Sequence, residues 1–416
     1  MARHQAYFDT LAADEQDSVS WASALAGLAV LRLVDAVRMD ADLIRTDWTG
    51  VCAVVDAVTA LGEGNRMRRP LMKVMDQLRD DHQDWGAIGK HVFDYGRTLD
   101  LEGNWGLAVD VFGMVADIAR AARKPELAMQ ATTALGGAAR RSGDWDRSAD
   151  GYAEAAHMAD ALGDKASGLT VRVGTANTLL ARGNLPASQL ILDDVISESA
   201  KSGLDGVAAL ALHTSASIAH LRGNFAEAVS IGYEALNKAT NPSAKDTILS
   251  DIAASFIELG MHDAARDANL VISLTSRYQW VRWQATINLM DLAARDGMEE
   301  AFFDYADQLR YAALDPRLRS YFLLYYGQGC VRCGREEEGR HQIAEAQRFA
   351  TRQKIHQVAF DAEKVLASLA GERKSRPAEP VQPRSDPVPD GALQVAEALT
   401  YIRKTALSSP QAGDWM

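Results

Sequence analysis

The chain has 416 residues, of which 47% are hydrophobic and 24% are charged, a balance typical of a folded protein with a packed interior. Its 44 basic and 56 acidic residues give a net charge of -12, which repels nucleic-acid phosphate and anionic membrane surfaces, so we expect neither as a partner. Three cysteines are too few for a disulfide framework, which excludes the small disulfide-stabilised folds.

Residues 1–83 are predicted to form an N-terminal helical cap, in which Gly64 leaves room for one degenerate repeat of the kind described below. The first ten residues, MARHQAYFDT, lack the apolar core of a secretory signal, so we expect a cytoplasmic location. The longest apolar run, 24–31, ends at Arg32 and is well short of the roughly 20 residues that a membrane-spanning helix needs. It is predicted to be a buried helix.

Residues 84–371 contain seven glycines at nearly constant spacing, most of them followed by a residue typical of a helix start. The spacing is 40 residues three times and then 37 residues three times. Such a repeat accommodates two helices and a tight turn, in which glycine ends the first helix in the left-handed conformation and Asn or Asp caps the second. The glycines are Gly103, Gly143, Gly183, Gly223, Gly260, Gly297 and Gly334.

Small residues occupy two fixed positions of nearly every repeat, where the two helices of a hairpin must approach closely. The residues seven before each turn glycine are Gly96, Gly136, Ala176, Ala216, Ala253, Met290 and Gly327. The residues five after it are Ala108, Ser148, Ser188, Ala228, Ala265, Phe302 and Gly339. The repeat around Gly297 departs at both positions, so we expect its hairpin to be splayed or rotated.

The small residue before the turn, the G-[ND]-[WF] turn and the small residue after it resemble the signature of the tetratricopeptide repeat (TPR). The segments GNWGLAVDVF, GDWDRSADGYAEA and GNFAEAVSIGYEAL match it best. The resemblance covers about residues 84–368 and implies an all-α, right-handed α-solenoid of about seven helical hairpins after the N-terminal cap. Units of 40 residues are longer than the usual TPR and are similar to the elongated repeats of bacterial TPR regulators and sensors.

The C-terminal region differs in composition from the repeats. Residues 372–390 carry five prolines and few apolar residues, which predicts an extended, disordered linker. Residues 391–416 begin with an amphipathic helix whose apolar stripe includes Val395, Leu399 and Ile402. The stripe leaves three interpretations open: a frayed tail, a cap that folds back on the last repeat, or a helix that docks into a partner through these three residues.

No motif typical of catalysis occurs in the sequence, which lacks GxSxG, GxxxxGK[ST], HExxH and GxGxxG patterns. We therefore predict a protein that is not an enzyme and that uses no cofactor or metal. The nearest candidate site is Cys330-x-x-Cys333, which would need two further ligands to hold zinc. Structural packing, redox sensing and metal binding all remain open for these two cysteines.

The predicted binding site lies in the concave groove that the first helix of each TPR hairpin lines. The sixth residue before the turn glycine is expected to point into this groove, where Asn can pair with a peptide amide and Arg with a carboxylate. The alternative is a solvated face without a ligand. The predicted partner-binding residues are Arg97, Arg140, Arg141, Asn177, His213, Ser217 and His220.

These observations predict an interaction scaffold or adaptor that holds a partner protein or an extended peptide in its groove. One alternative is a peptide-responsive regulatory receptor, because a helical cap followed by seven repeats resembles the layout of bacterial quorum-peptide receptors. A second alternative is an accessory subunit of an enzyme complex. The partner's identity and the oligomeric state do not follow from the sequence.

Overall fold

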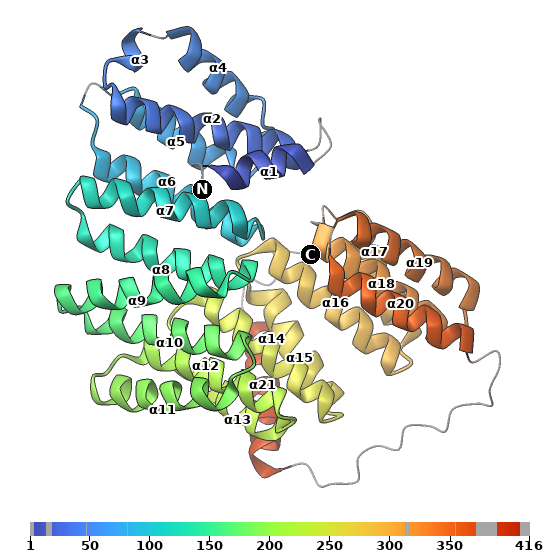
Figure 1. Cartoon of the computed structure of the whole chain (residues 1–416). Coiled ribbons are helices and arrows are strands. Elements are labelled where there is room, and N and C mark those ends of the chain that lie inside the picture. Colours follow the sequence, from blue (N-terminus) through green and yellow to red (C-terminus); the bar gives the residue numbers. More distant parts are fainter. Residues whose placement is uncertain are drawn as a thin grey trace. The chain divides into compact units, whose positions relative to one another are not determined.

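All regular secondary structure in the described part of the chain is α-helical, which confirms the expected all-α class (Figure 1). The computed structural model describes residues 4–13, 19–46, 48–80, 82–312, 314, 316–353, 355–371 and 389–407. The predicted linker, apart from its last two residues, and the last nine residues of the tail lie outside this part. The chain divides into two compact units, Met1–Val195 and Ile196–Met416, which are described separately.

The first unit begins with a small helical bundle. Its helices are α1 (Gln5–Ala13), α2 (Val19–Met39), α3 (Leu43–Thr46), α4 (Trp48–Thr59) and α5 (Arg68–Leu78). The predicted buried helix is α2, which continues past Arg32 and Asp35, so Ser20–Met39 is long and apolar enough to cross a membrane by length and composition alone. Leu31 and Val34 of this helix are fully buried in the core of the bundle.

The repeats form helical hairpins, each with a first and a second helix, stacked within each unit (Figure 1). The first unit holds α6 (Trp85–Leu101) with α7 (Trp105–Ala121), α8 (Pro125–Ser142) with α9 (Trp145–Leu162), and α10 (Lys165–Ala181) with α11 (Leu185–Lys201), which runs across the boundary. The second unit holds α12 (Asp205–Leu221) with α13 (Phe225–Lys238), α14 (Pro242–Glu258) with α15 (His262–Thr275), α16 (Gln279–Arg295) with α17 (Glu299–Arg310), α18 (Pro316–Arg332) with α19 (Glu336–Arg352), and then α20 (His356–Gly371). We call the surface that the first helices form within each unit the first-helix face.

Each of the seven predicted turn glycines has a positive φ, between 71° and 83°, as a left-handed helix end requires. Among the described residues between hairpins, three more are left-handed: Gly163 and Gly203 with φ of 65°, and Arg123 with φ of 54°. From Gly103 to Gly223 a left-handed residue therefore recurs every 20 residues. The 40-residue repeat is thus two nearly equal halves, each made of one helix and one tight turn.

The change from a 40-residue to a 37-residue spacing follows from a shorter second helix. The second helix has 17 or 18 residues in α7, α9 and α11 but 14 in α13 and α15, a loss of about one turn. The chain then leaves these two helices in an extended conformation, with ψ of 124° at Ala239 and 135° at Ser276. Pro242 next begins α14, behind an Asn241 side chain that accepts a hydrogen bond from the amide of Ser243.

All fourteen residues at the two close-approach positions are buried. The crossing of α18 and α19 is tight enough to require glycine, because a Cβ atom on Gly339 would lie 2.6 Å from the carbonyl oxygen of Gly327. In the atypical hairpin of α16 and α17, the Phe302 side chain is fully buried and its ring lies against Gly329 of α18. A glycine in the neighbouring first helix therefore makes room for the large residue that this repeat carries.

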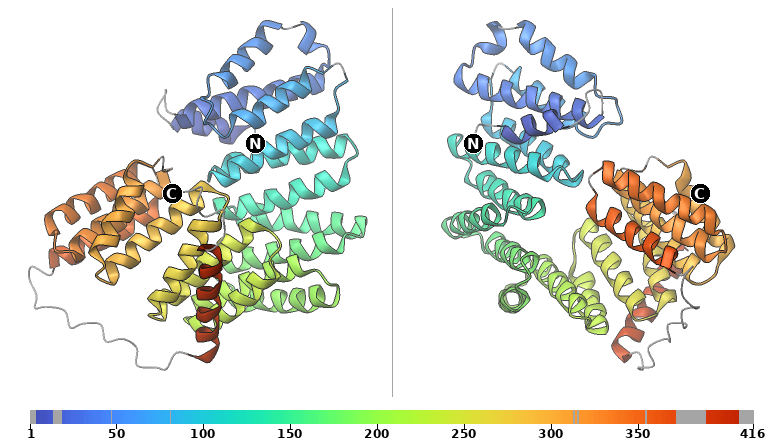
Figure 2. Two further views of the ribbon diagram at one scale, coloured as in Figure 1. Left: turned by 180° about the vertical axis from the view of Figure 1, so that it is seen from behind. Right: turned by 45° about the vertical axis from the view of Figure 1, so that its right-hand side comes forward.

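The predicted amphipathic helix is α21 (Asp390–Leu407), and it packs along α13 and α15 in the second unit (Figures 1 and 2). Ala392 and Leu399 are fully buried there, Val395 is nearly so, and Ile402 packs against the same cluster. Of the three interpretations of this stripe, the cap on the last repeat does not match this position, because α21 covers the second helices of the fourth and fifth hairpins instead.

Candidate functional site

The predicted partner-binding residues fall into two groups, one in each unit. Arg97 on α6, Arg140 and Arg141 on α8, and Asn177 on α10 belong to the first unit. His213, Ser217 and His220 lie together on α12 of the second unit. The predicted residues of α6, α8 and α10 and those of α12 thus belong to different units.

In the first unit, Arg141 is engaged by the neighbouring first helix. Its guanidinium donates three hydrogen bonds to the carboxylate of Asp100 on α6, from Nε to Oδ1 at 3.0 Å and from Nη2 to Oδ1 at 2.5 Å and to Oδ2 at 2.6 Å. Because such bidentate pairs fix both partners, Arg141 is better placed to join α6 to α8 than to bind a ligand.

Arg140 contacts a tyrosine of the next helix, whereas Arg97 is exposed. The side chain of Arg140 reaches the hydroxyl of Tyr152, whose pKa is raised by burial and lowered less strongly by Arg140 and Arg141. The Nε atom of Arg140 is buried without a hydrogen-bond partner among the described residues. Arg97 is exposed on α6, and Asn177 is partly buried on α10.

In the second unit, the polar groups of α12 are satisfied by the repeats themselves. The Nε2 atom of His213 lies 2.7 Å from Oδ2 of Asp251 on α14, and Nδ1 of His220 lies 2.9 Å from Oγ of Ser255 on the same helix. The hydroxyl of Ser217 donates to the carbonyl oxygen of His213 at 3.1 Å. These three residues therefore hold α12 and α14 together or bond within α12.

Pairing between successive first helices recurs along the repeats. Besides the pairs of Arg141 and His213, the guanidinium of Arg332 on α18 donates to Asp291 on α16 at 3.1 Å. The side chain of Asp291 is only 8% exposed and also accepts from Arg295, so it is a paired, buried charge. Much of the polarity that the sequence places on the first helices thus stabilises their stacking.

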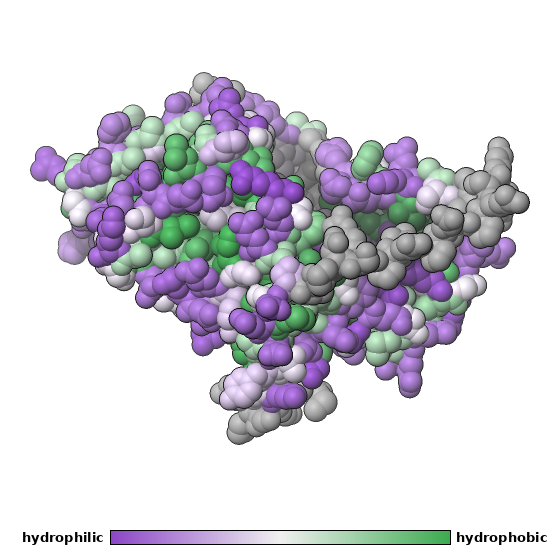
Figure 3. Space-filling view, turned by 90° about the horizontal axis from the view of Figure 1, so that it is seen from below, coloured by the Kyte–Doolittle hydropathy of each residue, from purple (hydrophilic) through white to green (hydrophobic). Residues whose placement is uncertain are grey.

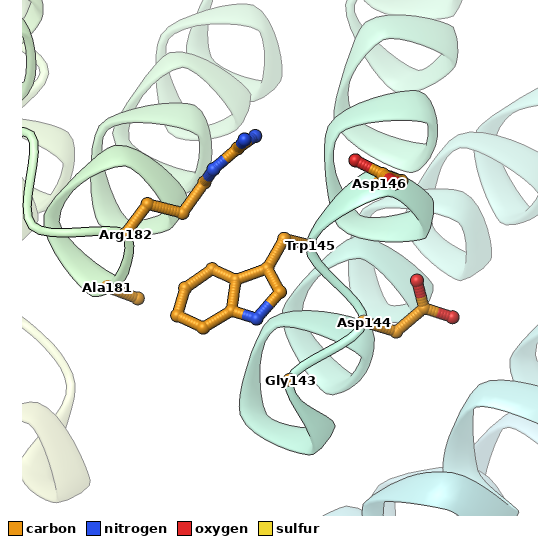
Figure 4. A pocket seen from close by; sticks show the side chains of 6 residues that line it. All are labelled: Gly143, Asp144, Trp145, Asp146, Ala181 and Arg182. Atoms are coloured by element: carbon orange, nitrogen blue, oxygen red, sulfur yellow. The ribbon is translucent and has the colours of Figure 1, made fainter.

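A depression of about 550 Å³ lies at the hairpin ends of the first unit, and sequence reasoning did not identify it. In Figure 4, the indole of Trp145 lies between the end of α10, with Ala181 and Arg182, and the turn that carries Gly143 and Asp144. An aromatic ring beside one guanidinium and two carboxylates suits a polar polypeptide segment more than an apolar small molecule. The signal in the sequence is a tryptophan at the first position of a second helix, directly after the G-D turn.

The two cysteines of the C-x-x-C motif are free, Cys330 being buried and Cys333 partly buried. Burial raises the pKa of the Cys330 thiol to about 11 and also raises that of Cys333, so both thiols stay protonated near neutral pH. In the described ranges no group of three or more His, Cys, Asp or Glu side chains is placed to hold a metal ion. Cys330 belongs to the buried core cluster of the last hairpins, which favours the packing interpretation.

The surface seen from below shows hydrophobic side chains in small groups between hydrophilic ones (Figure 3). Exposed large apolar residues include Leu190 at 68% and Tyr401 at 72%. Single apolar residues on a polar surface are common in folded proteins and do not by themselves mark a binding site.

No protein-family model and no curated protein matches the chain. Among solved structures, BtubC (BKLC) from P. vanneervenii is 14% identical, with a TM-score of 0.38 over 47% of this chain and 83% of that one. The apo form of the quorum sensor NprR from B. thuringiensis is 11% identical, with a TM-score of 0.38 over 87% and 91% of the two chains. A circular tandem repeat protein with novel repeat topology is 13% identical, with a TM-score of 0.19 over 95% and 85%. At such TM-scores these likenesses carry no information about function.

Proposed function

We propose that this protein is a non-enzymatic, TPR-like interaction scaffold that binds a partner protein or an extended peptide on the first-helix face of the first unit. The observation that supports this choice is the contrast between the two units. On α12 the predicted residues are bonded within the repeats, whereas in the first unit Arg141 is paired with Asp100 but Arg97 is exposed on α6.

The repeat spacing of Arg97 and Asn177 also favours an extended ligand. Arg97, Gly137 and Asn177 occupy the same position of three consecutive repeats, six residues before the turn glycine. Gly137 between them is buried, and a Cβ atom there would lie 3.4 Å from the hydroxyl oxygen of Tyr152 and 3.5 Å from Nη2 of Arg141, so the ligand contacts fall to Arg97 and Asn177 on either side. An arginine that pairs with a carboxylate and an asparagine that pairs with a peptide amide would then fix the ligand at two points.

The test is affinity purification from the native host with three forms of the full chain as bait. The wild type and the control Gln189→Ala, which changes a partly buried residue of a second helix, should recover the same stoichiometric partner. The double variant Arg97→Ala/Asn177→Ala should recover at least tenfold less, because it loses hydrogen bonds worth about 2–3 kcal/mol in total. Equal recovery with all three baits would refute the proposed face. A short peptide in place of a protein would favour the regulatory receptor.

A further inference from the structure

The helix α21 occupies the outer side of two neighbouring second helices. Ala392, Val395 and Leu399 belong to one buried cluster with residues of α13 and α15, among them Leu236 and Val271. Gly391 lies so close to α13 that a Cβ atom there would be 3.0 Å from Oγ of Ser230. In helix-in-groove recognition of this kind, apolar residues at steps of three and four positions along the helix enter the groove.

A buried carboxylate fixes the position of α21 along this groove. Asp267 of α15 has a side chain only 9% exposed, and it accepts a hydrogen bond from the hydroxyl of Thr400 at 2.6 Å and lies 2.9 Å from Nη1 of Arg403. A buried charge that loses one partner is strongly unfavourable, so the groove selects a helix that supplies a cation at this point.

The same position receives a chain segment in the first unit. Asp267 is the seventh residue after its turn glycine, Gly260, and the equivalent residue after Gly103 is Asp110. The carboxylate of Asp110 on α7 lies 2.7 Å from Nδ1 of the buried His4, at the beginning of α1. Of the four repeats with aspartate at this position, two, those of Asp110 and Asp267, thus use the carboxylate to hold an added segment through a basic side chain.

An open hollow lies along the side of α21 that faces the beginnings of α15 and α17. The hollow has a volume of about 770 Å³ and is lined by residues at the beginnings of α15 and α17 and by Leu393, Ala396, Glu397 and Thr400 of α21. Leu393 and Met298 remain 44% and 45% exposed. A helix with larger side chains at the positions of Leu393 and Ala396 would therefore bury more apolar surface than α21 does.

We propose that the outer groove of α13 and α15 is a second binding site, for an amphipathic helix of a partner protein, and that α21 covers the site until such a helix displaces it. The partner helix carries small or branched apolar residues at the positions of Ala392, Val395 and Leu399, an arginine at that of Arg403, and a larger apolar residue at that of Ala396. This site is distinct from the first-helix face and does not depend on the function proposed there.

The test uses the full chain with a protease site placed within residues 372–388, so that α21 can exchange after cleavage. The probe is a fluorescent synthetic peptide of residues 389–407, whose binding is followed by anisotropy. We expect the wild-type peptide to bind the cleaved protein and to bind the uncleaved protein at least tenfold more weakly, because tethered α21 competes at high effective concentration.

Peptide variants then test the chemistry of the groove. Arg403→Ala should weaken binding at least tenfold, Ala396→Leu should strengthen it several-fold, and Tyr401→Ala, which changes a residue 72% exposed, should leave it within about twofold. In protein carrying Asp267→Asn, with circular dichroism confirming an intact fold, the difference between wild-type and Arg403→Ala peptides should shrink. Absence of binding to the cleaved protein, or equal binding of the Arg403→Ala peptide, would overturn the proposal.

Discussion

Replacing Gly174 by alanine tests the packing of the Tyr152 ring in the second hairpin. The ring of Tyr152 on α9 lies between two glycines, Gly136 on α8 and Gly174 on α10. A Cβ atom at Gly174 would lie 2.9 Å from Cδ1 of the ring and closer still to two further ring atoms. Because a Cβ at Gly136 would already be 3.1 Å from the opposite side, the ring has no room to yield.

The expected magnitude is the difference between two effects. Overpacking in a closely packed core costs about 1–3 kcal/mol, whereas alanine is about 0.5–1 kcal/mol better than glycine inside a helix. Since the new Cβ atom would lie far inside contact distance of the ring, the overpacking cost falls in the upper half of that range, about 2–3 kcal/mol. We therefore expect Gly174→Ala to lower the free energy of unfolding by about 1–2.5 kcal/mol, measured by urea denaturation with circular dichroism as the signal.

The matched control is Gly113→Ala on α7 of the same unit. There a new Cβ atom would make ordinary contacts, the nearest at 3.7 Å, so only the helix preference remains. The control should be more stable than wild type by about 0.5–1 kcal/mol. If both variants shifted in the same direction, or if Gly174→Ala unfolded at the wild-type urea concentration, the packing of Tyr152 between two glycines would be refuted.

Arg123→Gly should stabilise the protein by about 0.5–1 kcal/mol in the same assay, because a left-handed conformation strains every residue but glycine, whereas Gly163→Ala at the equivalent turn should destabilise it. Burial alone would lower the pKa of His4, but its hydrogen bonds to two carboxylates outweigh burial and raise it from 6.5 to about 9. The charged His4 therefore stabilises the folded state by about 3 kcal/mol below about pH 6.5, and this contribution is lost as the pH rises through about 9. Wild type should accordingly be much more stable than His4→Gln at pH 6 and only slightly more stable at pH 10. An equal difference at both pH values would contradict the pairing. Leu399→Ala removes a fully buried side chain worth about 2–5 kcal/mol of packing, so amide hydrogen exchange in α21 should accelerate at least tenfold while exchange in α18 stays unchanged.

The hairpin architecture could be predicted because the left-handed conformation that ends a helix is adopted mainly by glycine. Each glycine at a turn indicates a left-handed helix end, and the small residues before and after it indicate that the two helices of the hairpin cross closely. Arg123 could not be recognised in this way, because an arginine gives no sign that its backbone is left-handed. Because Arg123 interrupts the series of glycines, the 20-residue half-repeat was not recognised, although Gly163 and Gly203 each stand 20 residues from the neighbouring turn glycines.

The contacts of the polar residues could not be predicted from the same pattern. His213 meets Asp251 and Arg141 meets Asp100, and these pairs lie 38 and 41 residues apart in the chain. Which residues meet depends on how far each hairpin is shifted along its neighbour, and repeat spacing does not contain this offset. Position six before the glycine therefore identified residues near the first-helix face without showing which of them the stacking already uses.

The position of α21 on the repeats could not be predicted from the sequence either. Its stripe of alanine, valine and leucine fits many apolar grooves, and the stripe alone does not distinguish the last hairpin from any other. The selective contact is that of Arg403 and Thr400 with Asp267, a residue 133 positions before Thr400. Only the three-dimensional arrangement shows that this carboxylate is buried and needs a partner.

The most direct test of the central claim is hydrogen–deuterium exchange of the full chain, with and without the partner that affinity purification recovers. If the partner binds the first-helix face of the first unit, amides of α6, α8 and α10 on that face should exchange more slowly in the complex, and the side of α7 and α9 turned away from it should not change. Protection confined to second helices, or confined to the second unit, would contradict the proposed function.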